Sequence, residues 1–217
     1  MTKEGKSLGV FLSNDLSMKR QISAVKKSCF NVLYSLRNVK QFLTEEIKLL
    51  LIKSLVISKL DFCNSLYMNI PQYLLNILHR LMNYCVRFIY NVPKSVSATQ
   101  CYFDAHILPI HLRIKFKCSL IVHNCIHGTA PHYLKSLFQL DDSSDRYYNL
   151  RITSEKIRLR TIHTARTSVF ATRCLSMYGP VIWNELSESL RCCVSSEDFK
   201  KQLKTYLFNI FEEETKH

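Results

Sequence analysis

The spacing of apolar residues along the chain predicts a succession of amphipathic helices. From Ser17, the expected N-cap, to about Asn38, apolar side chains recur at three- and four-residue steps and form a single stripe. Thr44 followed by two glutamates is typical of a second helix start, because acids suit the first helical turn. This second helix, reaching about Tyr67, is apolar on almost every side, which predicts a central position in a bundle.

A third helix begins at Pro71 and runs to about Tyr90, and short connections make the three helices antiparallel neighbours. Beyond them the pattern predicts short helices at 98–105 and 131–138, a helix at 110–127, a helix that starts at Gly179-Pro180, and a last helix from the Ser195 cap to about 211. The expected fold is therefore mainly α: a three-helix bundle, a second helical region and a basic, partly extended C-terminal segment.

Changes in pattern along the chain divide it into five segments, with an acidic loop at 141–145 as the clearest boundary. The segments are 1–16 with a β-like run at Leu8–Leu12, the bundle at 17–95, the second helical region at 96–140, a basic loop or extended segment at 141–178, and C-terminal helices at 179–217.

Composition supports a helical globular protein. Of the 217 residues, 47% are hydrophobic and 22% charged, which excludes wholesale disorder. Glycine occurs only 4 times, which leaves little material for hairpins, phosphate-cradling loops or a dinucleotide-binding fold.

The net charge of +13 indicates a polyanionic partner, either RNA and/or DNA held by its phosphate backbone or an anionic membrane surface, and a merely solvated basic surface is the alternative. No acidic residue lies between Asp15 and Glu45, and 146–173 holds seven basic residues and one acidic residue. Arginine suits phosphate because its planar fork matches the oxygens. The candidate binding residues are Lys19, Arg20, Lys26, Lys27, Arg37, Lys40, Arg151, Lys156, Arg158, Arg160 and Arg166.

No catalytic or metal-binding constellation stands out. The densest Cys/His cluster is Cys118, His123, Cys125 and His127, but at about 100° per helical residue the cysteines and histidines fall on opposite sides of one helix. Asp141-Asp142 lacks the preceding β-strand that a two-metal site needs. We therefore expect no catalytic residues, no metal and no cofactor.

Nine cysteines, an odd number spread through apolar stretches, are typical of reduced thiols used as small core residues. The first twenty residues have too short an apolar run for a secretory leader, and no apolar stretch approaches the ~20 residues of a membrane span. The expected location is intracellular, in the nucleus or cytoplasm, with no membrane partner and no secretion.

Several segments resemble the C-terminal part of the reverse transcriptases of non-LTR (LINE-type) retrotransposons. They occur in family order over nearly the whole chain: LGVFLSNDL at 8–16, SKLDFCNSL at 58–66, LHRLMN at 78–83, LPIHLRI at 108–114, HGTAPHYL at 127–134, PVIWNEL at 180–186 and SSEDFKKQLKTYLF at 195–208.

The resemblance implies that 1–16 is the last strand of a polymerase palm and that 17–95 is its thumb. In this family the thumb lays a helix along the template–primer duplex, and here that role would fall to the helix from Lys19 to Lys40. The aspartates of the palm, including the aromatic-x-Asp-Asp turn, do not occur in this sequence. The expected function is that of a polymerase fragment that binds nucleic acid without catalysis of its own, the palm and fingers of the parent enzyme being partners.

The alternative is a non-catalytic helical module for protein–protein interaction, whose basic charge is incidental. A further expectation concerns Leu8–Leu12: as a palm strand without its sheet, this segment would be an exposed edge and promote self-association.

Overall fold

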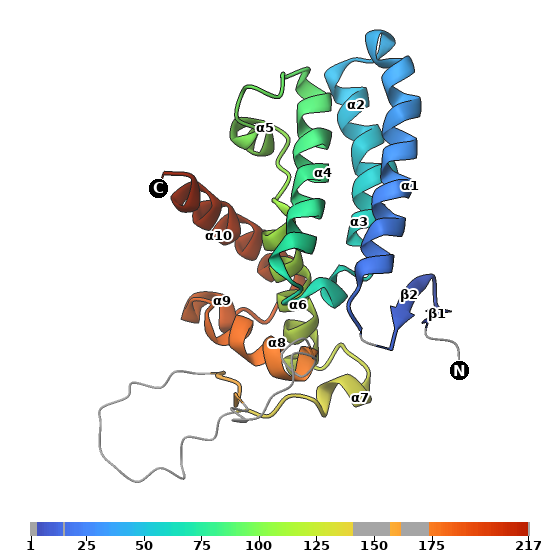
Figure 1. Ribbon diagram of the computed structural model, residues 1–217. Helices are drawn as coiled ribbons and strands as arrows, with labels where there is room; N and C mark the ends of the chain where they lie inside the picture. Colours follow the sequence, from blue (N-terminus) through green and yellow to red (C-terminus); the bar gives the residue numbers. More distant parts are fainter. Residues whose placement is uncertain (1–3, 15, 141–156, 162–173, 217) are drawn as a thin grey trace. The chain divides into compact units, whose positions relative to one another are not determined.

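The computed structural model describes residues 4–14, 16–140, 157–161 and 174–216, and over these ranges the chain is mainly helical. This confirms the predicted fold class. Arg151, Lys156 and Arg166 lie outside the described residues. The helices and strands, in chain order, are β1 (Glu4–Ser7), β2 (Val10–Ser13), α1 (Lys19–Asn38), η1 (Lys40–Phe42), α2 (Glu45–Ile52), η2 (Lys53–Ile57), α3 (Ser58–Asp61), η3 (Asn64–Tyr67), α4 (Gln72–Tyr90), α5 (Thr99–Asp104), α6 (Ile110–Ile126), α7 (His132–Lys135), α8 (Leu175–Asn184), α9 (Glu188–Arg191) and α10 (Ser196–Lys216) (Figure 1).

The chain forms two compact units. The first comprises residues 1–114 together with 214–217, and the second comprises 115–213. The division falls inside α6, whereas the sequence placed its clearest boundary in the acidic loop at 141–145, which lies outside the described residues.

The first unit opens with a β-hairpin, which the sequence did not predict. β1 and β2 pair antiparallel, with Ser7 opposite Val10, so Leu8 and Gly9 form a two-residue turn with φ values of 46° and 86°. The expected strand at Leu8–Leu12 is therefore wrong in extent: Leu8 is the turn, and β2 has a partner in β1. Val10 is buried, and β2 is paired with β1 along one edge; self-association through this segment stays a prediction.

Helix α1 follows the predicted apolar stripe but begins differently from the prediction. Its N-cap is Met18, in the left-handed region with φ 57°, and this residue makes no side-chain cap hydrogen bond; the predicted cap at Ser17 is wrong. The amide of Phe11 donates to Oε1 of Gln21 over 2.9 Å. This bond ties β2 to the first turn of α1, so a tertiary contact helps to define the start of the helix.

The second predicted helix begins as expected but is neither continuous nor wholly buried. The Thr44 hydroxyl accepts a hydrogen bond from the Ile47 amide, so the predicted cap is confirmed. The helix passes through α2, the π-helical stretch η2 and α3, and it ends at Asp61 rather than near Tyr67. The predicted central position holds for one side of the helix only: Ile52, Val56 and Leu60 are fully buried, whereas Leu50 is 66% exposed. The large apolar side chains that are exposed on this segment are Ile47, Leu50 and Leu55.

Helix α4 matches its prediction closely, with Pro71 at the N-cap and Asn91 ending it in the left-handed conformation. Its inner side buries Leu78, Met82 and Cys85 almost completely. α1, the α2–α3 segment and α4 run side by side (Figure 1). This packing gives α1 one buried side and one solvent-facing side.

A bidentate ion pair joins two distant parts of the first unit. Arg113, on α6, donates from Nε to Oδ1 of Asp61 over 2.9 Å and from Nη2 to Oδ2 of the same carboxylate. Both side chains are only about one-fifth exposed, at 19% for Arg113 and 20% for Asp61. Asp61 and Arg113 belong to the segments SKLDFCNSL at 58–66 and LPIHLRI at 108–114, and the pair gives both residues a structural role.

We expect Asp61→Ala to lower the free energy of unfolding by about 2 kcal/mol, because a largely buried guanidinium loses its carboxylate. A double-mutant cycle with Arg113→Ala, measured by urea denaturation, should give a coupling energy of about 1–2 kcal/mol. The exposed pair Lys200–Glu197 is the matched control and should show no measurable coupling. Equal coupling in the two pairs would contradict the structural role of Asp61.

The second unit has its own aromatic core. Trp183 on α8 and Phe199 on α10 are fully buried, with ring centroids 5.8 Å apart, and Leu203 and Leu207 continue the buried side of α10. The predicted cap of α10 is confirmed, since the Asp198 amide donates to the Ser195 hydroxyl.

Helix α8 begins earlier than predicted. It starts at Leu175, so Pro180 lies inside it rather than at its first turn. A proline at this point removes the single bond that its amide would donate to residue 176, close to the N-terminus. Apolar packing offsets that loss, because Gly179, Pro180 and Ile182 are all buried.

The short described stretch 157–161 is held against α8 by hydrogen bonds. Trp183 Nε1 donates to the carbonyl of Ile157 over 2.8 Å, and the Asn184 side chain both donates to and accepts from the backbone of Leu159. Leu159 also forms a β-bridge with Leu140. Trp183 and Asn184 belong to the segment PVIWNEL, so these residues too have a structural role.

Candidate nucleic-acid interface

Four of the predicted basic residues lie on one exposed side of α1. At about 100° per residue, Lys19, Lys26 and Arg37 fall within about 20° of one another, and Lys27 lies about 80° away. All four side chains are exposed, and we call Lys19, Lys26, Lys27 and Arg37 the α1 basic face. By the same angles the buried stripe of Ile22, Cys29, Leu33 and Leu36 spans about 60° and lies beside the face, with Lys26 about 20° from Leu33 and Lys27 on the far side of the helix.

The α1 basic face carries uncompensated positive charge. α1 contains no acidic residue, and within the described ranges no carboxylate forms an ion pair with these four side chains. Like charges along one side of a helix repel one another and lower its stability slightly. Solubility alone does not require charges of a single sign on one side of a helix, whereas a surface that binds a polyanion does.

Two further predicted residues lie beside this face. The Arg20 guanidinium carbon is 4.7 Å from the ring centroid of Phe11, at the margin of the face near β2. Lys40 lies in η1, beyond the end of α1, with its ammonium 5.6 Å from the ring centroid of Phe88 on α4. The structure thus brings four of the six N-terminal candidates onto one surface and places the other two at its two ends.

Two aromatic residues on the same side of α1 did not figure in the sequence prediction. Phe30 and Tyr34 fall within the arc between Lys26 and Lys27, and they are 38% and 70% exposed. The Phe30 ring is 5.9 Å from that of Tyr84 on α4, in a tilted arrangement. Exposed aromatic rings among cations are the usual platform for stacking unpaired bases. Calculating the angles of Phe30 and Tyr34 around the helix axis would have placed both residues among the cations from the sequence alone.

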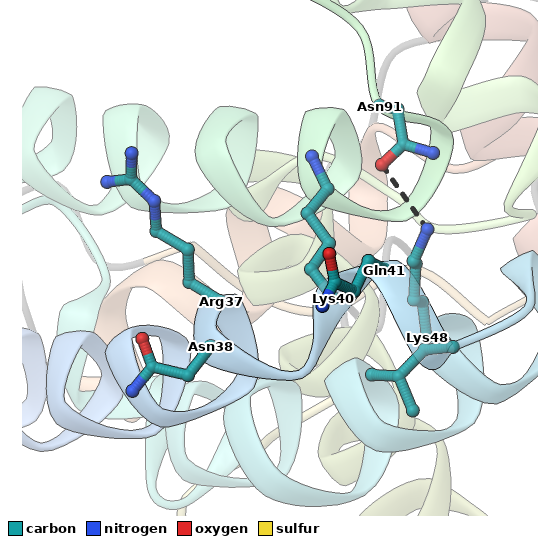
Figure 2. Close-up of a pocket in the computed structure, with 7 residues that line it drawn as sticks. Arg37, Asn38, Lys40, Gln41, Lys48 and Asn91 are labelled. Carbon is teal, nitrogen blue, oxygen red and sulfur yellow. Dashed lines mark hydrogen bonds between the residues drawn. The ribbon is translucent and has the colours of Figure 1, made fainter.

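A hollow of about 530 Å³ lies where α1 ends, and Arg37 belongs both to it and to the α1 basic face. Lys40 and Lys48 also line it, and their side chains and that of Arg37 extend to the same side (Figure 2). Lys48 was missed by the sequence prediction, because a lysine within an apolar run gives no sign that its ammonium is buried.

The second predicted basic region is described only at 157–161. There Arg158 and Arg160 are exposed on either side of the buried Leu159, the alternation expected of extended backbone. These two arginines belong to the second unit, whereas α1 belongs to the first.

The Cys/His cluster on α6 serves the core of the second unit. His123 stacks on Phe199 with ring centroids 4.2 Å apart, and its Nε2 lies 2.8 Å from the carbonyl oxygen of Cys193. The His127 ring is 4.3 Å from that of His123, and burial next to His123 lowers the pKa of His127. In the described part of the chain, no group of three or more potential ligands is placed to hold a metal ion.

The buried cysteines are poorly suited to nucleophilic chemistry. Burial raises the pKa of the Cys29 thiol to about 11 and that of Cys118 to about 12. Burial raises the pKa of Cys85 as well. Since the thiolate is the nucleophile, these thiols are protonated and unreactive at neutral pH.

Comparisons with protein-family models, with curated proteins and with solved structures find no match to this chain. In the described ranges, no helix is long and apolar enough to cross a membrane. The interface is therefore defined by its own geometry: four exposed cations on α1, two exposed aromatic rings among them, and a basic hollow at the helix end.

Proposed function

We propose that the chain binds RNA or template–primer duplex through the α1 basic face, by phosphate contacts that do not depend on sequence. The observation that carries this proposal is the alignment of Lys19, Lys26, Lys27 and Arg37 on one exposed side of a helix that has no acid. Lysine and arginine contacts to phosphate position a protein on a strand without reading its bases.

The dimensions of the face suit a polynucleotide. At 1.5 Å per residue, Lys19 and Lys26 lie about 10 Å apart along the helix axis, and Lys26 and Arg37 about 16 Å apart. A row of this length spans several phosphates of a strand, because each strand of double-stranded DNA carries one charge per ~3.4 Å of the helix axis. Tyr34 and Phe30 lie within the row and add stacking where the bound strand is single.

We further propose that the chain is the C-terminal part of a non-LTR retrotransposon reverse transcriptase, with α1 as the thumb helix that follows the template–primer. The support is the ordered set of sequence segments, together with the packing roles that the structure gives to Asp61, Arg113, Trp183 and Asn184 within them. Residues of this kind specify a fold rather than chemistry. No polymerase activity is expected from this chain alone, because its sequence lacks the aromatic-x-Asp-Asp turn.

Filter binding over a salt series tests the phosphate contacts. Four contacts predict that the logarithm of the affinity falls with the logarithm of the salt concentration with a slope of about −3 to −4. Two oligonucleotides of equal length and unrelated sequence should bind with affinities within about threefold of each other. An affinity that does not change with salt, or that depends strongly on sequence, would contradict the proposal.

A protein–protein interaction module is the second candidate function, and one observation favours it. Phe42, Ile47, Leu50 and Leu55 are exposed near and along the α2–η2 segment, with Leu50 at 66% and Phe42 at 75%. Exposed apolar side chains of this size are typical of interaction surfaces. Recovery of a protein partner that resists nuclease treatment and high salt, and that Leu50→Asp abolishes, would favour this function.

A further inference from the structure

The hollow at the end of α1 has the composition of an anion site. Besides Arg37, Lys40 and Lys48, its polar lining residues are Asn38, Gln41 and Asn91, and it contains no carboxylate. These residues come from the last turn of α1, from η1, from α2 and from the C-cap of α4. Its volume of about 530 Å³ is within the range of pockets that hold a small ligand.

Lys48 is the residue that most needs an explanation. Its side chain is almost completely buried, at 3% exposed, yet its ammonium donates a hydrogen bond to a neutral group, Oδ1 of Asn91, over 3.2 Å (Figure 2). A buried lysine is usually paired with an acid, because removing an ammonium from water is costly. Here its partner among the described residues is an uncharged amide, and the hollow beside it holds further cations and no acid.

The negative ends of two helix dipoles offset part of the positive charge in the hollow, but not all of it. The C-termini of α1 and α4 meet at the hollow, and each carries about half a negative charge. Together they offset about one of the three cations, which leaves about two positive charges. A terminal phosphate carries about −1.5 to −2 at neutral pH, whereas a phosphodiester within a strand carries one.

We propose that this hollow binds a phosphate monoester, the terminal phosphate of a polynucleotide held on the α1 basic face. Arg37 is common to the face and the hollow, so a strand that follows the face leads to Lys40 and Lys48 at its end. The polynucleotide source of the phosphate rests on the proposed function; the anion site itself rests on the three cations and their surroundings.

Adenosine 5′-monophosphate tests the anion site directly, by NMR titration of the labelled full chain at low salt with adenosine as the comparison ligand. We expect the monophosphate to shift the backbone amides near Lys48 and Asn91, and adenosine to leave them unchanged. Arg37→Gln/Lys40→Gln should weaken monophosphate binding at least tenfold, and this variant spares the buried Lys48. The matched control, Lys53→Gln/Lys94→Gln, removes the same charge from exposed positions outside the hollow and the α1 basic face and should change the affinity less than twofold.

Oligonucleotides of one sequence, with a phosphate at the 5′ end, at the 3′ end or at neither, test the source of the phosphate. One phosphorylated form should bind at least fivefold more tightly than the unphosphorylated strand, and Arg37→Gln/Lys40→Gln should remove that advantage.

Absence of monophosphate binding, or equal losses in both double variants, would overturn the anion site. Monophosphate binding without any end preference would assign the hollow to free nucleotides and overturn the polynucleotide source. Monophosphate binding with no oligonucleotide binding at all would refute the proposed function and leave the anion site standing.

Discussion

Replacing Lys19, Lys26, Lys27 and Arg37 together by glutamine should weaken binding of a random-sequence oligonucleotide by about a hundredfold to a thousandfold at 0.1 M salt. The estimate follows from counterion release, since each lost phosphate contact removes about 0.7–0.9 from the salt slope. The four side chains are exposed and have no ion-pair partner among the described carboxylates, so the variant should fold normally. Filter binding measures the affinity, and circular dichroism checks the fold.

A matched control separates the α1 basic face from the overall charge. Glutamine at Lys53, Lys94, Lys200 and Lys201 removes four positive charges from other exposed positions. This control should lower the affinity by less than about threefold, because screened charges away from the bound strand act only weakly at this salt concentration. Equal losses in the two variants would show that net charge, rather than the α1 face, determines binding.

Phe199→Ala should lower the free energy of unfolding of the second unit by about 3–5 kcal/mol, the usual cost of truncating a buried phenylalanine. Phe199 is fully buried between His123, which stacks on it at 4.2 Å, and Trp183 at 5.8 Å. Trp183 is the only tryptophan of the chain and lies in this core, so its emission reports unfolding of this unit directly.

The same substitution at an exposed phenylalanine is the control for this prediction. Phe42 in η1 is 75% exposed, and Phe42→Ala should change the stability by less than about 0.5 kcal/mol. Urea denaturation followed by tryptophan emission gives the transition of the second unit, and circular dichroism gives that of the whole chain, including the first unit in which Phe42 lies. A midpoint in Phe199→Ala that matches the wild type would refute the assignment of this residue to the core.

The long helices could be predicted from sequence because their evidence is local. The apolar stripe of α4, its start at Pro71 and the cap at Thr44 depend on residues within a few positions of one another. The exposure of the α1 cations follows less directly from periodicity: Lys19, Lys26 and Arg37 lie beside the buried stripe, so their exposure depends on how α1 packs.

The features that sequence reasoning missed depend on contacts between distant residues or on unusual backbone. β1 reads EGKS, without a strong β-former, and it forms a strand because β2 pairs with it across a left-handed turn at Leu8 and Gly9. Helix α8 continues through Pro180 because burial of its apolar residues outweighs one lost hydrogen bond.

The hollow at the end of α1 could not be predicted from sequence either, because it depends on contacts between distant residues. Lys48 and Asn91 are joined by a hydrogen bond across 43 positions of sequence, and nothing near Lys48 in the chain predicts this partner. Arg37 and Lys40 were predicted as phosphate contacts along a helix, but their common position around a hollow depends on how α1, α2 and α4 pack.

Ultraviolet crosslinking of bound RNA to the full chain, followed by trypsin digestion and mass spectrometry, tests the central claim most directly. Trypsin cleaves after Lys27 and Arg37, so the exposed rings of Phe30 and Tyr34 fall in one peptide, residues 28–37. We predict that this peptide carries the main crosslink and that high salt suppresses it. Crosslinks confined to peptides outside α1, with 28–37 recovered unmodified, would contradict binding through the α1 basic face.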